Sequence, residues 1–223
     1  MSVTRLDTVD LSEVIEAQRL TGFILKLVAV SVLVTFFDGY DMQGIAYVAP
    51  YLQPAFHLDR LMLGNIFSAG IAGNFIGAMA IGWLGDYFGR RPAIVWSTVA
   101  FGVLTCAQAL SQTYEQFLIL RFIDGIAIGG MIPVCWALNI EYAPKRFRST
   151  IVTIVMVGYT IGASAAGPIA VWFIPRFGWQ SSFLFGGIGS LLAGALLYFT
   201  LPESIRFLCA KAGNRDMIAG TIR

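Results

Sequence analysis

Long apolar segments separated by short polar ones run through most of this 223-residue chain. A helix that crosses the roughly 30 Å hydrocarbon core of a bilayer needs about 20 predominantly apolar residues. Segments of this kind lie at residues 23–49, 61–83, 93–110, 114–140, 149–174 and 181–201. The pattern predicts an all-α integral membrane protein, with a six-helix domain at 23–201 between a tail at 1–22 and a further segment at 202–223.

Composition supports a membrane protein and excludes several other classes. Hydrophobic residues make up 57% of the chain and charged residues only 13%, against about a quarter charged in an ordinary soluble domain. The net charge of +2 is too small to indicate nucleic-acid binding. The cysteines have no paired spacing, so neither a disulfide framework nor a metal site is expected.

Lysine and arginine are distributed unevenly among the polar segments. The tail and alternate loops carry twelve of the 15 basic residues, the other loops carry Arg60 and Arg176, and Arg121 lies inside the fourth predicted helix. Cytoplasmic loops of membrane proteins are enriched in lysine and arginine. We therefore expect both ends of the chain on the cytoplasmic side of a bacterial-type inner membrane.

Small residues at four-residue spacing indicate where helices pack closely in a bilayer. The chain has three glycine pairs of this kind: Gly73 with Gly77, Gly125 with Gly129, and Gly158 with Gly162. Gly167 and Pro168 predict a kink in the fifth helix, which could serve transport or be merely structural. Asn65, Asn74 and Gln108 are polar side chains in apolar segments, and either substrate contacts or hydrogen bonds between helices would explain them.

The segment between the second and third predicted helices combines an acid, glycines and two arginines, and it is expected to form a tight cytoplasmic turn. It runs from Gly82 to Pro92 and includes Asp86, Gly89, Arg90 and Arg91. This segment resembles the signature loop of the major facilitator superfamily. The resemblance extends to Arg121 to Gly125 in the fourth helix, to residues 141–148 after it, and to Pro202-Glu203-Ser204 after the sixth. It implies half of a carrier, built from two inverted three-helix repeats.

The signature loop also has a physical interpretation. A carboxylate at Asp86 can face a helix N-terminus or an arginine, while Gly82 and Gly89 would let neighbouring backbones come close. By resemblance, Asp86, Arg90, Glu141 and Arg148 would form a cytoplasmic charge cluster that stabilises the outward-open state and breaks when the halves rock. The alternative is that Arg90 and Arg91 serve only to fix the topology.

Ionisable side chains at helix depth cost several kcal/mol unless they face a partner or a cavity, so each is a functional candidate. Asp38 and Asp41 lie in the first helix, and Arg121 and Asp124 lie in the fourth. A rise of about 1.5 Å per residue places Asp38 and Arg121 near one level. Arg121 and Asp124 could equally form an internal ion pair at three-residue spacing, whereas two aspartates cannot neutralise each other.

The element from Asp38 to Asp41 resembles the first-helix signature of the aromatic acid:proton symporter family. Members of that family import benzoates and related ring acids. The charges at one level in turn suggest that Arg121 would bind a substrate carboxylate, with Tyr40 and Asp124 also at the substrate site, and that Asp38 or Asp41 would carry the coupling proton. Ala163 stands where antiporters of the superfamily usually have glycine, which favours symport. The alternatives are a sugar or dicarboxylate symporter of the same superfamily, and a transport-inactive half or sensor.

The interpretation as a carrier also fixes the expected partners. They are a small organic acid, protons, the lipid bilayer and a second six-helix half, to which residues 202–223 would begin the linker. No Ser-His-Asp, metal-ligand or phosphate-loop spacing appears, so neither an enzymatic activity nor a cofactor is expected. The proton gradient would supply the energy.

Overall fold

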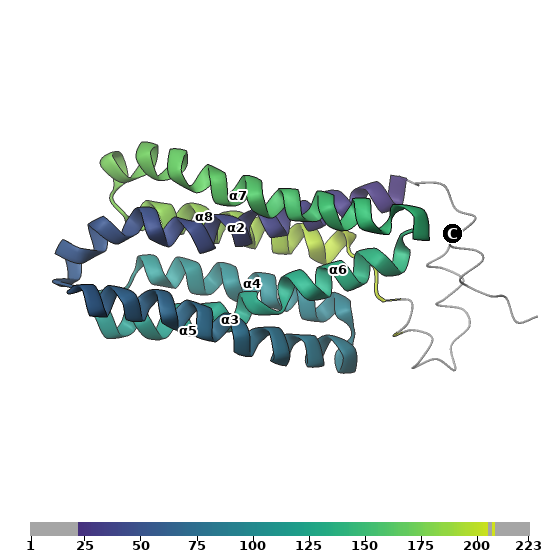
Figure 1. The fold of residues 1–223 in the computed structure, drawn as a ribbon, viewed down its shortest axis with the longest axis horizontal. Helices are drawn as coiled ribbons and strands as arrows, with labels where there is room; N and C mark the ends of the chain where they lie inside the picture. The colour runs from purple at the N-terminus through teal and green to yellow at the C-terminus, as the bar shows by residue number, and fades with distance from the viewer. Residues whose placement is uncertain (1–21, 205–206, 208–223) are drawn as a thin grey trace, which may run out of the picture.

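The computed structural model describes residues 22–204 and 207, which form a bundle of long helices (Figure 1). Six spans among these residues are long and apolar enough to cross a membrane, which confirms the predicted number. Most of the predicted tail and linker lies outside the described residues. The helices are α2 (Gly22–Phe56), α3 (Arg60–Phe88), α4 (Arg90–Ala109), α5 (Tyr114–Gly129), α6 (Met131–Tyr142), α7 (Arg148–Phe177) and α8 (Gln180–Thr200), with a 3-10 turn, η1, at Lys145–Phe147.

Two predicted boundaries are wrong because the helices continue through residues that usually end them. The first helix was expected to stop at residue 49, but α2 continues through Pro50 and Pro54 to Phe56. The tight turn expected between Gly82 and Pro92 is present, but its extent is wrong, because α3 includes Asp86 and Gly89 alone separates it from α4. Transmembrane helices tolerate proline when nearby groups satisfy the freed backbone carbonyls.

The fourth span is interrupted in the structure, whereas the sequence predicted one continuous helix. Gly130 separates α5 from α6, and the side chain of Ile81 occupies the position that a Cβ at Gly130 would take. Pro133 in the first turn of α6 has no N–H to continue the hydrogen-bond ladder of α5. In contrast, α7 continues as one helix through Pro168, and the kink predicted there stays a prediction.

Close pairs of helices from the two halves of the chain build the bundle. A Cβ at Gly73 or Gly77 of α3 would collide with backbone carbonyls of α5, and a Cβ at Gly125 or Gly129 would collide with α3. The third predicted pair acts similarly, because Gly162 of α7 lies against the carbonyl of Phe36 in α2. Small residues therefore set the closest approaches, as the sequence predicted.

The arrangement of these pairs matches two inverted three-helix repeats. The α2 helix packs mainly on α7, α3 on α5, and α4 on α8. In order of spans these are the first with the fifth, the second with the fourth, and the third with the sixth. Exchanging the first three spans for the last three leaves this set of pairs unchanged, as an inverted repeat requires.

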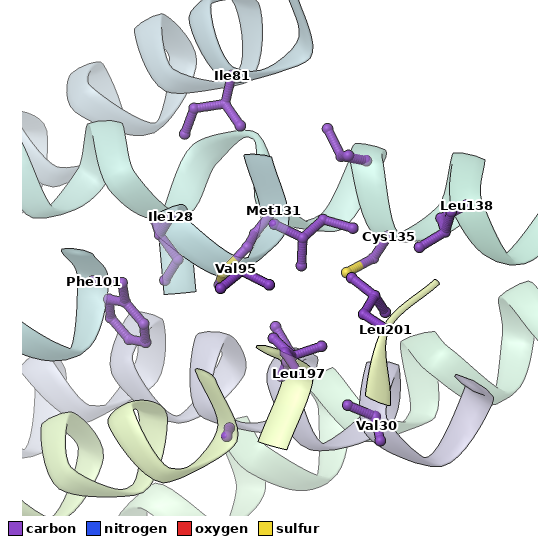
Figure 2. Close-up of a cluster of buried hydrophobic side chains, with 14 of the residues drawn as sticks. Val30, Ile81, Val95, Phe101, Ile128, Met131, Cys135, Leu138, Leu197 and Leu201 are labelled. Atoms are coloured by element: carbon purple, nitrogen blue, oxygen red, sulfur yellow. The ribbon is translucent and has the colours of Figure 1, made fainter. Parts of the chain in front are cut away.

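An apolar core fills the bundle between these pairs toward the end where α3 meets α4. Phe101 of α4, Ile128 of α5 and Leu197 of α8 are all almost fully buried there (Figure 2). Met131 and Leu138 of α6 extend the same cluster toward Leu201, Val30 and Cys135 (Figure 2). The core holds the helices in the register that places the polar groups described below.

Candidate functional site

A cluster of buried charges joins the first and fourth spans in the interior of the bundle. Nη1 of Arg121 in α5 lies 2.6 Å from Oδ2 of Asp41 in α2 and 3.4 Å from Oδ2 of Asp124. All three side chains are buried: the exposed fraction is 4% for Arg121, 3% for Asp41 and 1% for Asp124. These residues and Asp38 are called the buried cluster below.

Helix packing explains why Arg121 can occupy this place. The nearest heavy atom to a Cβ at Gly70 of α3 would be Nε of Arg121, at 3.1 Å. Any side chain at Gly70 would therefore press on the guanidinium. A buried ion pair needs good geometry to offset the cost of removing both charges from water. The missing side chain at Gly70 gives Arg121 the room for that geometry.

The structure pairs Arg121 with a different acid from the one that the depth estimate singled out. The estimate placed Asp38 at the level of Arg121, but the ion pair is formed by Asp41, one helical turn further along α2. Asp38 is 2% exposed and makes no hydrogen bond or ion pair within the described part of the chain. The predicted pair of Arg121 with Asp124 is also present, as the longer of the two contacts.

Tyr40 points away from the buried cluster. Its hydroxyl lies 2.8 Å from Oγ of Ser182 and 3.0 Å from the Ser182 carbonyl, and its ring packs beside Phe185 of α8. The tyrosine therefore joins α2 to α8 here, and its predicted substrate contact stays a prediction. Phe37 lines an apolar groove of about 550 Å³ between α7 and α8, also outside the cluster.

Two polar residues of α4 adjoin the buried cluster. Oγ1 of Thr105 lies 3.2 Å from Oδ1 of Asp124 and donates to the carbonyl of Phe101 at 2.9 Å. Gln108, one turn along α4, is fully buried beside Asp124, yet neither Nε2 nor Oε1 has a hydrogen-bond partner within 22–204. The amide of Gln108 in an apolar segment was the sequence signal, but only the structure places it against Asp124.

A second set of charges lies at one end of the bundle, where α3 meets α4 and α6 meets α7. Arg90 Nη1 donates to Glu141 Oε1, and Ser204 Oγ lies 2.6 Å from Glu141 Oε2. Glu203 Oε1 accepts hydrogen bonds from the backbone N–H groups of Arg91 and Ser204, at 3.2 and 2.8 Å. Arg90, Glu141, Glu203 and Ser204 are called the end cluster below.

Gly89 forms the turn between α3 and α4 that brings the first turn of α4 against Glu203. Its φ of 108° is unfavourable for any residue with a side chain, and a Cβ there would lie 2.8 Å from the carboxylate of Glu203. Glu203 thereby places its negative charge at the first turn of α4, where free backbone N–H groups favour an anion. The exit motif contributes directly to the structure around the signature loop, which sequence reasoning missed.

Several residues that were predicted for the cytoplasmic charge cluster lie at the edge of the end cluster or outside it. Asp86 is 77% exposed and only 3.8 Å from Arg90, so the contact is a loose one. Arg148 binds the carbonyl of Ala143 through Nε, and Arg91 binds the carbonyl of Tyr198. The close approach expected at Gly82 is wrong, because nothing lies within 4 Å of a Cβ there.

Comparisons with known proteins agree with this architecture. Residues 31–208 match the sequence profile of the Major Facilitator Superfamily. The chain belongs to this family. Its fold is similar to that of the xylose transporter XylE from E. coli in a partially occluded inward-open conformation, with a TM-score of 0.82 at 22% identity over 91% of this chain and 54% of that one. It is thus a multi-pass membrane protein.

Relatives with higher identity carry a consistent set of names. The chain is 37% identical to the 4-hydroxybenzoate transporter PcaK of Acinetobacter baylyi, over 96% of this chain and 47% of the relative. It is 33% identical to the gallate transporter of Pseudomonas putida, over 96% and 48%, and 33% identical to the benzoate transport protein of A. baylyi, over 91% and 44%. The chain spans about half the length of the curated relatives it matches.

Proposed function

We propose that this six-helix domain takes part in the proton-coupled symport of a small aromatic carboxylate by alternating access. The buried ion pair of Asp41 and Arg121, with 2.6 Å between its charged atoms, is the observation that carries the proposal. Ionisable groups at membrane depth are costly and mark substrate and proton pathways. The names of the relatives, which include transporters of 4-hydroxybenzoate, gallate and benzoate, support the substrate class.

Asp41 and Arg121 supply a simple coupling step. A proton bound by Asp41 removes the negative charge that holds Arg121, and the guanidinium becomes available to a substrate carboxylate. Arginine binds a carboxylate through two parallel hydrogen bonds, which favours a planar acid over a sugar hydroxyl. Proton binding and substrate binding then favour the same state of Arg121, so each promotes the other.

The end cluster would act as the gate of this domain. Arg90 of α4, Glu141 of α6 and Ser204 after α8 link three spans at one end of the bundle. A conformation in which these spans move apart would have to break this network, so the cluster stabilises one side of the alternating-access cycle. We place this end, and both ends of the chain, on the cytoplasmic side of a bacterial inner membrane.

The remaining partners follow from the family. A second six-helix half would complete the substrate site, since carriers of this kind bind substrate between their repeats. The proton gradient would supply the energy without a bound cofactor, and no enzymatic step is proposed. The described residues contain no group of three or more His, Cys, Asp or Glu side chains suited to a metal.

The test measures uptake of labelled 4-hydroxybenzoate into membrane vesicles that express the full coding sequence. We expect accumulation when an inward proton gradient is imposed and its collapse when a protonophore is added. Excess benzoate should compete, while xylose and succinate should not. Accumulation that ignores the gradient, or stronger competition by xylose or succinate, would point to the sugar or dicarboxylate alternative, and no uptake at all would favour an inactive half or a sensor.

Variants connect the uptake to the ion pair. Asp41→Asn should abolish proton-driven accumulation but keep the exchange of substrate for substrate, because Arg121 is permanently released from its close contact with residue 41. Arg121→Lys should weaken both, because an ammonium lacks the planar fork. Glu115→Gln is the matched control, since Glu115 is exposed in the first turn of α5. Equal loss in the Glu115 variant would mean that the effect is not specific to the ion pair.

A further inference from the structure

The buried cluster holds more acids than its single base can neutralise. Asp38, Asp41 and Asp124 are 2, 4 and 1% exposed, and Arg121 is the one cation within contact of them in the described structure. An uncompensated charge in this environment is strongly unfavourable. The cluster is electrically neutral when two of the three acids carry protons. Since Asp41 holds the close contact with Arg121, the two protons belong to Asp38 and Asp124.

The hydroxyl of Thr105 can hydrogen-bond Asp124 in either of its proton states. A threonine hydroxyl has one proton to donate and can also accept. The shorter contact of Oγ1, at 2.9 Å, is to the Phe101 carbonyl, which can only accept. Oγ1 can donate to Oδ1 of the Asp124 carboxylate across the 3.2 Å contact, or accept from the protonated acid while its own proton goes to the carbonyl.

Gln108 supplies a second adaptable neighbour. Both polar atoms of its buried amide lack partners within the described part of the chain, and the amide lies beside Asp124. An amide can donate through Nε2 to a carboxylate or accept through Oε1 from a carboxylic acid. A buried amide without a partner is costly, so its presence here indicates a group that is satisfied in another state of the site.

We propose that Asp124 is a second proton-binding residue of this domain, which exchanges its proton state with Asp41 through Arg121. Thr105 is a positioning residue that contacts Asp124 in this structure, and Gln108 is a positioning residue placed to hydrogen-bond Asp124 when its proton state changes. This inference rests on the proposed proton coupling and deepens it, because it names where a proton resides after Asp41. It also separates Asp124 from the substrate contact that the sequence suggested.

The exchange balances in protons and charge. One proton binds the Asp41 carboxylate and breaks its ion pair with Arg121, whose guanidinium keeps all of its own protons. Arg121 then closes its 3.4 Å contact with Asp124, and the O–H bond of the aspartic acid breaks and releases one proton. The cluster starts and ends with one free carboxylate beside one guanidinium.

The geometry gives this exchange a direction. Asp124 follows Arg121 by three residues along α5, which leads through α6 to Glu141 of the end cluster. Asp41 follows Asp38 along α2, which starts at that same end, where Phe23 packs on Tyr142. A rise of about 1.5 Å per residue therefore places Asp41 farther from the end cluster than Asp38, and Asp124 nearer to it than Arg121. A proton that enters at Asp41 and leaves from Asp124 moves toward the end cluster.

The groups that face Asp124 come from each helix packed around it. From α2 they are Asp41 and, farther away, Asp38, and from α5 itself Arg121. The α4 helix contributes the neutral Thr105 and Gln108, and α3 packs against this turn of α5 through glycine. A change in the proton state of Asp124 is thus governed by the two aspartates and one arginine already named.

Infrared difference spectroscopy on the lipid-reconstituted chain tests the proposal without any transport. A protonated carboxyl group has a carbonyl band that is separate from the band of a carboxylate. We expect Asp124→Asn to remove one such band from the neutral-pH spectrum. We expect Asp41→Asn to remove the same band, because Arg121 then pairs with Asp124 and expels its proton. Glu115→Gln, which changes an exposed acid, should leave the spectrum unchanged.

Two further variants separate proton binding from mere structural support. Thr105→Val and Gln108→Leu should shift the frequency of the Asp124 band without removing it, because each takes away a polar group beside the acid. These two variants also test the proposal if the Asp124→Asn protein does not fold. A spectrum in which none of these variants changes a protonated-carboxyl band would overturn the proposal. So would survival in Asp41→Asn of the band that Asp124→Asn removes, whereas a separate band from protonated Asp38 is expected to remain. If proton-driven uptake occurs but the Asp124 band is absent, the inference is refuted and the proposed function stands. If the Asp124 band is present but uptake is absent, only the proposed function is refuted.

Discussion

The buried cluster and the end cluster both combine carboxylates with one arginine, but the carboxylates have different numbers of hydrogen-bond partners. In the end cluster, Glu141 is bound by both Arg90 and Ser204, and Glu203 by two backbone N–H groups. In the buried cluster, Asp41 and Asp124 share one nitrogen of Arg121, and Asp38 has no hydrogen bond or ion pair among the described residues. One network is satisfied, and the other is short of positive charge.

This difference indicates what each cluster does. A fully hydrogen-bonded network resists change, because each broken contact leaves a polar group without a partner. A site with surplus acids responds to protons, because protonation is the cheapest way to remove an uncompensated charge. The end cluster is therefore suited to hold a conformation, and the buried cluster to sense the proton gradient. The changes below probe this contrast.

The largest effect is expected for Arg121→Met. Loss of one partner of a buried ion pair costs about 3–5 kcal/mol, because the remaining charge stays buried. The loss should be greatest at mildly alkaline pH and smaller in acid, where the aspartates can neutralise themselves by binding protons. Unfolding in detergent across this pH range measures it. Arg176→Met, at the exposed end of α7, is the control, and a loss equal to that control would contradict the assigned charge balance.

A smaller effect is expected for Glu141→Gln. The change removes the ion pair with Arg90 but leaves an amide that can still bind Ser204, so about 2 kcal/mol of unfolding free energy should be lost. This loss should vary little with pH between neutral and mildly alkaline conditions, unlike that of the Arg121 variant. Parallel unfolding curves measure it. A pH dependence as steep as that of Arg121→Met would remove the distinction between the two clusters.

Gly89→Ala tests whether the backbone supports the end cluster. The φ of 108° disfavours alanine, and the added Cβ would meet the carboxylate of Glu203. A cost of about 1–2 kcal/mol is expected from a residue held in such a conformation. Gly82→Ala is a matched control in the same motif, because nothing lies within 4 Å of a Cβ there. Equal unfolding free energies for the two variants would show that Gly89 has no special role.

The smallest effect on stability is expected for Asp86→Asn. The carboxylate is 77% exposed and 3.8 Å from Arg90, and exposed pairs of this kind contribute less than about 1 kcal/mol after screening by salt. Insertion should be normal, while transport should slow if Asp86 pairs with another helix during the cycle. Uptake rates at matched protein levels measure this. An unchanged rate would remove Asp86 from the gate.

The sequence predicted the fold more accurately than it predicted the contacts between side chains. The six spans and the three glycine pairs were predicted correctly, because apolar length and residue size are properties that each segment carries by itself. The ends of α2 and α3 were not, because proline and glycine end helices in water more reliably than in a bilayer. Likewise, the depth estimate placed Asp38 at the level of Arg121 but could not choose between Asp38 and Asp41 as its partner, since such an estimate ignores the rotation of each helix.

The amino-acid sequence alone determined that this chain crosses a membrane six times and buries three acids and an arginine near one level. Only the tertiary structure decided that Asp41 holds Arg121, that α4 brings Thr105 and Gln108 to Asp124, and that Glu203 reaches the first turn of α4. The physical reason is the distance along the chain over which each effect acts. Hydrophobicity acts along each segment, whereas the partner of a buried charge depends on how closely glycine lets distant helices approach and how they turn toward one another.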